Sequence, residues 1–467
     1  MKTPNNNPDN KPDNCPPPKK RYFAPWEKSF DRVVTPFDEF IHDETTGSIF
    51  LMVCTVAALI LTNSDMAEAY SKLFHAYAGI VVGDWSLKMS LSHWINDGLM
   101  ALFFFVAGLE IKREILVGEL ATPKRAALPI AAAVGGMIAP ALIYFAINPE
   151  GAGAQGWAIP MATDIAFAVG ILVMLGSRIP KTLVMFLVAM AIVDDLGGVL
   201  VIAIFYTEQI AGGYLAATAV IYLLLWGLNL SGVRKCSPYF ILGALLWYTM
   251  LNSGIHATIA GILLASTIPA RPQYEPRRFS ERVRDLMARF NKSHHQECNS
   301  YTNEEQRSIL QTLENTIHSA ETPLQRLEHS FHLPVAILIV PIFALANAGI
   351  PISFGTLGDT LSQPVALGVI CGLIIGKLVG ILSACWITLK FGIGRLPSGA
   401  RFSDLIGIAL LGGVGFTMSI FIAELGFAGS AEYLLQAKTG IITASFIGGV
   451  SGYLWFIVTR RKQDTTS

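Results

Sequence analysis

Two adjacent aspartates stand in the middle of a hydrophobic stretch of the chain. Asp194 and Asp195 lie in AIVDDLGGV, and residues 182–206 carry no other charge. An ionised Asp at the centre of a bilayer-spanning helix costs about 2.5–3.5 kcal/mol even on lenient insertion scales. Acidic residues at that depth usually line an aqueous path or bind ions, so the pair is a candidate cation and proton site. A purely structural role in helix packing is the less favoured alternative.

Four further ionisable residues lie inside hydrophobic stretches, namely Asp97, Asp164, His256 and Lys377. Structural and functional roles are equally favoured for Asp97, which lies nearer one end of its stretch. For His256, in NSGIHATIAG, a satisfied imidazole at a contact between small residues of two helices is favoured over a titrating role. Carboxyl and lysine groups that lose water shift toward their neutral forms, so such groups can exchange protons at physiological pH.

The composition predicts that these residues are held in a membrane protein. Of 467 residues, 52% are hydrophobic and 15% are charged, and the mean hydropathy is +0.49. Soluble domains carry about 25% charged residues. Apolar runs of about 17–25 residues, the length at which a helix crosses a bilayer, recur along most of the chain. We therefore predict an all-α polytopic membrane protein that is not an enzyme and binds no nucleic acid.

The hydrophobic runs predict twelve membrane-spanning helices. They cover residues 47–63, 92–111, 126–147, 157–175, 182–205, 212–230, 237–250, 254–270, 333–350, 364–389, 404–423 and 439–459. If both termini are cytoplasmic, 30 of the 34 Lys and Arg residues fall in inside segments, three fall outside and one, Lys377, lies in a span. This bias agrees with the positive-inside rule and supports a multi-pass arrangement with both ends in the cytoplasm.

The remaining segments are predicted to be tails and connections around a transmembrane domain at 47–460. Residues 1–46, rich in Asn and Pro, form a disordered cytoplasmic tail, and residues 461–467 form the other tail. Residues 64–90 contain a β-prone run at 79–82 and predict an extracellular hairpin that could join two copies of the chain. Residues 271–332 form a charged cytoplasmic segment. A surface helix is expected there after Asn303, with Ile309, Leu310, Leu313 and Ile317 on one face.

Two predicted spans contain helix breakers at similar depth. The stretch GWAIPMATDIAFAVG carries Pro160 before Thr163 and Asp164, and LGGVGFTMSIFIA carries three glycines at 412, 413 and 415. Each is the middle span of a three-span unit, at 126–205 and at 364–459, and the two units run in opposite directions. This pattern indicates inverted repeats with two discontinuous helices that cross at mid-membrane, as in secondary transporters. Asp164 could offset facing helix N-termini there, and Lys377 could offset facing C-termini or pair with an Asp.

Seven motifs resemble the sodium/proton antiporters of bacterial inner membranes, the NhaA family. They are FFFVAGLEIKREI, PMATDIAFAVGIL, AIVDDLGGV, NSGIHATIAGIL, PIFALANAGI, IGKLVGI and GGVGFTMSIFIAEL, in family order between about Phe37 and Lys462. The chain departs from the family pattern in a longer N-terminal tail, a longer 271–332 segment and Ala107 in VAGLE.

The resemblance implies roles for the site residues. Asp195 would be the principal sodium and proton carboxylate. Asp194 would belong to the same sodium site and would either pair with Lys377 or exchange its proton against it. Thr163 and Asp164 would lie at the crossing of the broken helices, and Asp97 would line the outward side. Glu110, Arg113 and Glu114 would sense pH at the cytoplasmic mouth, and His256 is the least favoured further candidate for pH sensing.

These roles imply exchange of cytoplasmic sodium or lithium for external protons. One carboxylate cannot hold a cation and a proton together, so competition at a site exposed alternately to the two sides gives antiport. Adjacent positions on a helix point about 100° apart, so Asp194 and Asp195 should differ in role. Two protons per sodium would make the exchange electrogenic. No cofactor is expected. A sodium-coupled symporter on a similar inverted-repeat scaffold is the alternative.

Overall fold

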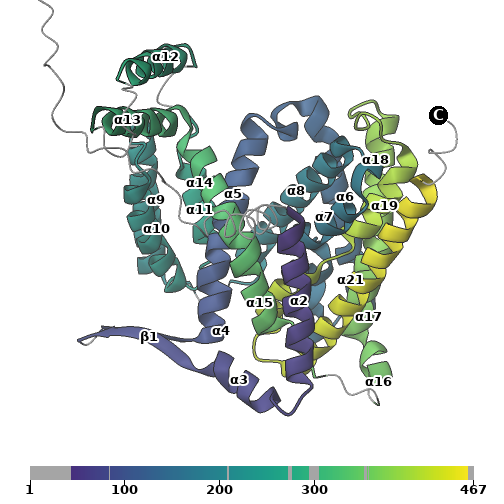
Figure 1. The fold of residues 1–467 in the computed structure, drawn as a ribbon. Coiled ribbons are helices and arrows are strands. Elements are labelled where there is room, and N and C mark those ends of the chain that lie inside the picture. Colours follow the sequence, from purple (N-terminus) through teal and green to yellow (C-terminus); the bar gives the residue numbers. More distant parts are fainter. Residues whose placement is uncertain are drawn as a thin grey trace, which may run out of the picture. The chain divides into compact units, whose positions relative to one another are not determined.

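The computed structural model describes residues 44–460, apart from 84, 208–209, 272–275, 294–303, 352–354 and 356. Within this part of the chain the structure is helical except for one two-stranded sheet (Figure 1). The chain divides into a larger compact unit, residues 41–268 and 327–467, and a smaller one, residues 1–40 and 269–326. The predicted tails 1–46 and 461–467 fall outside the described residues, except for 44–46.

The helices up to residue 268 belong to the larger unit. They are α2 (Glu44–Thr62), α3 (Ala67–His75), α4 (Leu91–His93), the π-helical turn η1 (Trp94–Leu99), α5 (Met100–Leu116), η2 (Glu119–Ala121), α6 (Pro123–Ile147), the 3-10 helix η3 (Ala152–Met161), α7 (Ile165–Met174), η4 (Gly176–Arg178), α8 (Lys181–Phe205), α9 (Gly212–Leu230), α10 (Cys236–Leu251) and α11 (Ile259–Thr267).

A second series of helices follows the charged segment. It comprises α14 (Pro323–Pro334), η5 (Val335–Ile339), α15 (Val340–Asn347), α16 (Leu357–Leu361), α17 (Pro364–Cys371), η6 (Gly372–Gly376), α18 (Lys377–Lys390), α19 (Phe402–Gly412), α20 (Phe416–Gly426) and α21 (Ala431–Arg460). The long helix α21 packs along both α17 and α19 (Figure 1).

The described residues form a polytopic helical membrane protein. Seven helical runs in them are long and apolar enough to cross a membrane, and two bent helix pairs raise the number to nine if each pair is one span. The predicted ninth span, 333–350, belongs to a longer helical run that begins at Pro323 and ends at Asn347. The end of the predicted cytoplasmic segment 271–332 is therefore continuous with that helix.

Only part of the predicted eighth span is helical. Of residues 254–270, only Ile259–Thr267 are α-helical. Gly254 has a φ of +86°, which a helix does not allow, and the Ser253 hydroxyl accepts a hydrogen bond from the Ile255 amide at 3.2 Å. Such local side-chain bonds compete with helix formation, and hydropathy alone does not reveal them.

Both predicted breaks are present. The chain is non-helical at residues 162–164, between η3 and α7, and the axes of α19 and α20 differ by 44° across residues 413–415. Each break lies in the second of three consecutive helical runs, which end with α8 in one case and with α21 in the other.

A stripe of glycines brings two helical runs together beside the first break. The four-residue spacing of Gly372, Gly376 and Gly380 puts them on one face of the α17–η6–α18 run. A Cβ at Gly376 would lie 2.6 Å from the Pro140 Cα, and one at Gly372 would lie 2.6 Å from the Pro160 Cβ. Small residues let backbones approach closely in membranes, and here they bring the start of α18, with Lys377, close to the break.

Residues 77–90 form the hairpin that the β-prone run predicts. Strand β1 (Tyr77–Val82) pairs antiparallel with β2 (Trp85–Ser90), with Tyr77 opposite Ser90. The Trp94 indole donates a hydrogen bond to the Ala78 carbonyl at 2.9 Å, which holds the hairpin to η1. Its extracellular position and its role in a dimer remain predictions.

The smaller unit contains two helices that pack on each other, α12 (Pro276–Lys292) and α13 (Glu304–Ala320). The helix expected after Asn303 is α13. Ile309 is buried, but Leu310 and Ile317 are exposed, because the face that packs inward is centred on Gln306, Ile309 and Thr316. The expected apolar face is therefore only partly covered.

Candidate ion-binding site

The two helix breaks cross in direct contact. The Asp164 amide donates a hydrogen bond to the Val414 carbonyl at 2.7 Å. A Cβ at Gly415 would lie only 3.0 Å from the Ala162 carbonyl oxygen, so the close approach of the two backbones requires glycine there. The unpaired backbone groups of four half-helix ends are thereby brought together in one buried place.

Asp164 caps two helices at once. Its carboxylate accepts hydrogen bonds from the Phe167 amide at 3.0 Å, near the start of α7, and from the Thr417 amide at 2.9 Å, near the start of α20. The Thr417 hydroxyl donates a third bond at 2.5 Å. Helix N-termini carry partial positive charge, so one buried carboxylate stabilises both ends. This is the position anticipated for Asp164.

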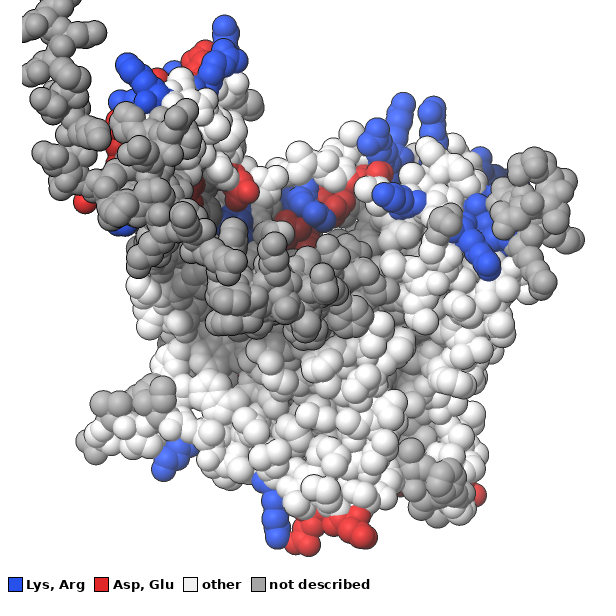
Figure 2. All heavy atoms as spheres, viewed as in Figure 1, with Lys and Arg blue, Asp and Glu red and all other residues white. Residues whose placement is uncertain are grey.

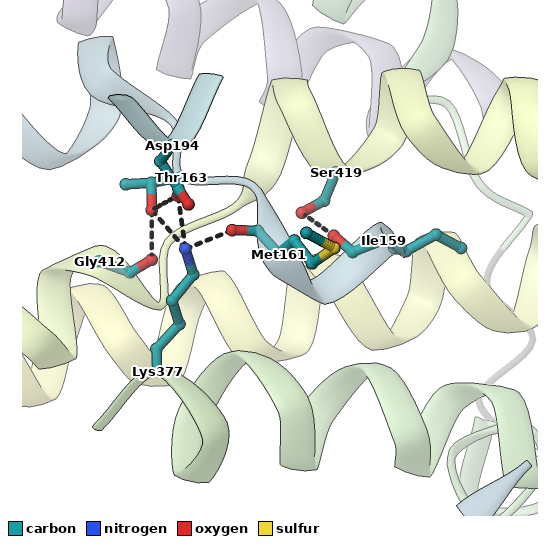
Figure 3. A network of polar contacts seen from close by, with 7 residues as sticks. All are labelled: Ile159, Met161, Thr163, Asp194, Lys377, Gly412 and Ser419. Carbon is teal, nitrogen blue, oxygen red and sulfur yellow. Dashed lines mark hydrogen bonds and ion pairs between the residues drawn. The ribbon is translucent and has the colours of Figure 1, made fainter. Parts of the chain in front are cut away.

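Lys377 lies on the other side of the crossing, where helices end. Its ammonium group donates hydrogen bonds to the Met161 carbonyl, at the end of η3, to the Thr163 hydroxyl at 3.0 Å and to Asp194 Oδ2 at 2.5 Å (Figure 3). Helix C-termini carry partial negative charge, so the ammonium is favourably placed. Lys377 therefore makes both contacts expected of it from the sequence, since it lies at a helix C-terminus and it pairs with an aspartate.

Thr163 joins the break to the aspartate pair. Its hydroxyl oxygen lies 2.8 Å from Asp194 Oδ2 and 2.9 Å from the Gly412 carbonyl oxygen at the end of α19 (Figure 3). It also accepts the bond from Lys377. With a single proton, the hydroxyl can donate to only one of its two acceptors at a time.

Asp195 differs sharply from its neighbour. Both of its carboxylate oxygens are buried and, among the described residues, neither has a hydrogen-bond partner. Asp194 Oδ1 is in the same situation, whereas Asp194 Oδ2 is held by Lys377 and Thr163. Buried polar atoms are almost always paired, and an unpaired buried carboxylate is costly. The side chain that lacks a partner is therefore suited to a proton or a bound cation.

The electrostatic surroundings of Asp195 link it to the rest of the site. Its carboxyl group lies within electrostatic reach of Asp194, Asp164, Lys377 and Glu110. Three acidic groups and one basic group thus surround the buried Asp195 carboxyl group, which favours the uptake of a positive charge.

Asp97 is separate from this cluster. It lies in the π-helical turn η1, and its backbone carbonyl accepts a hydrogen bond from the Trp247 indole at 2.8 Å. Its half-buried carboxyl group lies within electrostatic reach of His93 and His256. Turns of π-helix occur frequently at functional sites.

The residues assigned to pH sensing fall into two places. Arg113 forms ion pairs with Glu114 at 3.2 Å and with Glu328 at 3.1 Å, near the end of α5 that also carries Glu110. The structure places His256 near Asp97 instead. Asp97 precedes Arg113 by 16 residues in the same helical run, which corresponds to about 24 Å along a helix. The His256 imidazole is satisfied by the Tyr206 carbonyl at 2.9 Å, but in a non-helical stretch and not at a helix–helix contact.

Sequence reasoning missed two side chains of these clusters. Thr417 completes the caps of Asp164, and its place just after the glycine break was a usable signal, because Thr often stands at the start of a helix. Glu328 pairs with Arg113 but falls in a segment that hydropathy assigns to a loop, so the sequence offered no signal for it.

Comparisons with known proteins identify the family of the chain. A family model described as Na+/H+ antiporter 1 matches residues 38–456. The Na(+)/H(+) antiporter NhaA 1 of Saccharophagus degradans is 50% identical over 430 residues, which cover 92% of this chain and 93% of that protein. The Na(+)/H(+) antiporter NhaA of Sulfurimonas denitrificans is 50% identical over 435 residues, which cover 93% of this chain and 98% of that protein. The chain therefore belongs to the NhaA family of Na+/H+ antiporters, a family of multi-pass membrane transporters and not of enzymes.

Proposed function

We propose that this protein exports cytoplasmic Na+ or Li+ in exchange for external H+, and that the two ions compete for Asp195. The observation that carries the proposal is the pair of buried Asp195 oxygens without a hydrogen-bond partner, one residue away from an aspartate held by a buried lysine. A carboxyl group in this position is neutralised by a proton or by Na+, but not by both. Exposure of the site to the two sides in turn then gives antiport.

Asp194 and Lys377 supply the second exchangeable charge in this proposal. Asp194 Oδ2 is occupied by the ammonium group, at 2.5 Å, so it can contribute to a Na+ site only when that ion pair opens. Opening is favourable when Lys377 gives up its proton as Na+ arrives. Two protons then move against one Na+, and the exchange is electrogenic, drawing about 2.3 kcal/mol per net charge from 100 mV of membrane potential.

We further propose that the chain crosses the bacterial inner membrane twelve times, as two inverted three-helix repeats with both breaks near mid-membrane. The repeats would be α6, η3–α7 and α8, and α17–α18, α19–α20 and α21. Support comes from the contact between the breaks, through Asp164 and Val414, and from the break in the second member of each set. Rocking of one helix group against the other would expose the crossing to each side.

The orientation proposed has both termini in the cytoplasm. Figure 2 shows the Lys and Arg side chains of the larger unit gathered mainly at the end opposite the β1–β2 hairpin, in line with the positive-inside rule. Asp97 would then line the outward side, and Glu110, Arg113 and Glu114 would sense pH at the cytoplasmic mouth. The hairpin would contact a second copy of the chain. The family match favours antiport over the sodium-coupled symporter that the sequence left open.

The test is an Asp195→Asn variant assayed in everted membrane vesicles. Vesicles with a respiration-generated pH gradient, reported by a quenched weak base, are given Na+ or Li+ over a range of pH. We expect the active protein to restore fluorescence and Asp195→Asn to restore none. Asp359→Asn, at an exposed position in α16, is the matched control and should behave as wild type. Exchange retained by Asp195→Asn would overturn the assignment.

Electrogenicity has its own measurement in proteoliposomes. Clamping the membrane potential with valinomycin and K+ should change the rate of exchange at a fixed pH gradient. A rate independent of the imposed potential would contradict the two-proton scheme while leaving antiport intact.

A further inference from the structure

Helix α12 has a charge pattern that the transport site does not use. It carries six basic residues and two acidic ones over Pro276–Lys292, and all eight are exposed. The basic residues are Arg277, Arg278, Arg282, Arg284, Arg289 and Lys292. A net charge of this size on one helix is a strong electrostatic feature in a protein whose formal net charge is zero.

The basic residues border the apolar face of the helix, which is the face that carries Leu286 and Met287. Helical spacing puts Arg278, Arg282 and Arg289 on one flank of that face, and Arg277 and Arg284 on the other. The two acidic residues, Glu281 and Asp285, lie on the polar side of the helix and form exposed ion pairs one turn away, with Arg277 at 3.9 Å and Arg289 at 4.0 Å. Exposed pairs of this kind contribute little and leave the arginines available to a stronger anionic surface. Basic residues at the boundary between apolar and polar faces are characteristic of helices that lie in a membrane interface, because their long side chains reach from apolar surface to charged headgroups.

Packing against α13 leaves these flanks outward. Leu286 of α12 and Ile309 of α13 are buried where the helices meet, with exposed fractions of 3% and 8%. Met287 remains exposed beside them. Figure 2 shows Lys and Arg side chains, with some Asp and Glu side chains among them, at this helix pair. The charged surface is therefore presented by a packed element and not by an isolated helix.

The chain also ties this element closely, at both ends, to helices of the predicted transmembrane domain. Eight residues separate Thr267, at the end of α11, from Pro276, and they can span at most roughly 29 Å. Two residues separate Ala320, at the end of α13, from Pro323, where a membrane-length helical run begins. Both ends of the α12–α13 pair are thus anchored near a bilayer surface. On the orientation proposed above, that surface is the anionic cytoplasmic leaflet.

We propose that the basic flanks of α12 bind the phosphate headgroups of anionic phospholipids on the cytoplasmic face of the membrane. Guanidinium groups form paired, charge-assisted hydrogen bonds with phosphate oxygens, which are the anionic groups that phospholipid headgroups present. The proposal rests on the cytoplasmic placement of the segment but not on the transport mechanism. Each basic residue near an anionic surface contributes about a fivefold factor to binding, so loss of three weakens docking on the order of 100-fold.

The test measures the distance of α12 from the lipid in the full-length protein. A fluorophore is attached to an Asn291→Cys variant, at an exposed position of α12, after replacement of the six native cysteines. The protein is reconstituted in phosphatidylcholine liposomes with or without phosphatidylglycerol, with trace lipid that carries a quencher on its headgroup. We expect stronger quenching with phosphatidylglycerol, and its reversal by high salt.

Two variants on the same helix give the decisive comparison. Arg278→Gln/Arg282→Gln/Arg289→Gln should abolish the phosphatidylglycerol-dependent quenching, and Gln keeps the helix propensity of Arg. Glu281→Gln/Asp285→Asn raises the net positive charge and should retain or strengthen the quenching. Quenching that is equal in the two lipids, or unchanged in the triple variant, would overturn the proposal. Labelling of the Asn291→Cys variant by an impermeant thiol reagent in right-side-out vesicles would also overturn it, by showing that the cytoplasmic placement is wrong.

Discussion

Replacement of Lys377 by Met should destabilise the protein in a way that depends on pH. The Lys377 side chain is only 1% exposed and is the sole cation bonded to Asp194 among the described residues. Its removal leaves Asp194 buried with Thr163 as its one remaining hydrogen-bond partner. The variant then holds either an unpaired buried charge or a protonated carboxyl group.

The loss of stability is set by whichever state of the buried Asp194 costs less free energy, the unpaired charge or the protonated carboxyl group. Breaking a buried ion pair costs about 3–5 kcal/mol. Protonation of a carboxyl group with an ordinary pKa of about 3.9 costs about 1.36 kcal/mol per pH unit above that value, hence about 3 kcal/mol at pH 6 and about 5.6 kcal/mol at pH 8. The folded variant takes up a proton that the unfolded chain does not hold, so its stability falls as pH rises. We expect a loss of about 3 kcal/mol at pH 6 and up to about 5 kcal/mol at pH 8.

The assay is thermal unfolding of the purified protein in detergent at the two pH values, at one scan rate and without Na+. Asp194→Asn is the second single variant, and Asp194→Asn/Lys377→Met completes the cycle. Because the double variant buries neither charge, it should be more stable than Lys377→Met at pH 8, and the two single effects should not add. Equal losses for Lys377→Met at pH 6 and pH 8, together with additive effects, would refute the reasoning.

Three other substitutions test the scaffold of the site. Asp164→Asn removes the charge at two helix N-termini and should cost about 1–2 kcal/mol and abolish exchange in everted vesicles, which thermal unfolding and the vesicle assay check together. Gly380→Leu places a Cβ against the Gly135 carbonyl and should prevent close packing of α18 on α6, seen as loss of monodisperse protein in size-exclusion chromatography. Arg460→Gln leaves Asp404 buried without its 2.7 Å ion pair and should cost about 3–5 kcal/mol of stability. The double variant with Asp404→Asn should recover most of this loss, and an unchanged melting temperature of Arg460→Gln would contradict the reasoning.

The centre of the site was predictable from the sequence because the residues there conflict with their surroundings. Asp194, Lys377 and Asp164 stand in apolar stretches, and hydropathy therefore isolates them. The helix breaks were visible for a similar reason, because Pro160 and the glycine cluster at 412–415 disfavour a continuous helix. Helix-end electrostatics suggested that Asp164 could offset facing N-termini and that Lys377 could offset C-termini or pair with an Asp, and the structure has hydrogen bonds of both residues at helix ends.

Other features depend on tertiary contacts that one sequence does not reveal. The carbonyl groups of Met161 and Gly412 enter the site only because the broken helices stop there, and backbone groups have no sequence signature. His256 is a pH-sensing candidate alongside Glu110 on the sequence, whereas its position beside Asp97 follows only from the fold. The eighth predicted span is α-helical only over Ile259–Thr267, because hydropathy does not detect the turn at Ser253–Gly254.

The surroundings of Lys377 indicate why neighbouring aspartates of identical chemistry take different roles in the proposed exchange. Its ammonium group is held by a backbone carbonyl, a hydroxyl and a carboxylate, from Met161, Thr163 and Asp194. Unwound carbonyl groups and half-helix C-termini are the oxygens that coordinate Na+ in broken-helix transporters. The protonated lysine thus occupies oxygens that a cation at Asp195 would recruit. In the proposed exchange, entry of Na+ and retention of the Lys377 proton are therefore mutually unfavourable, and the ion pair couples the two exchangeable charges.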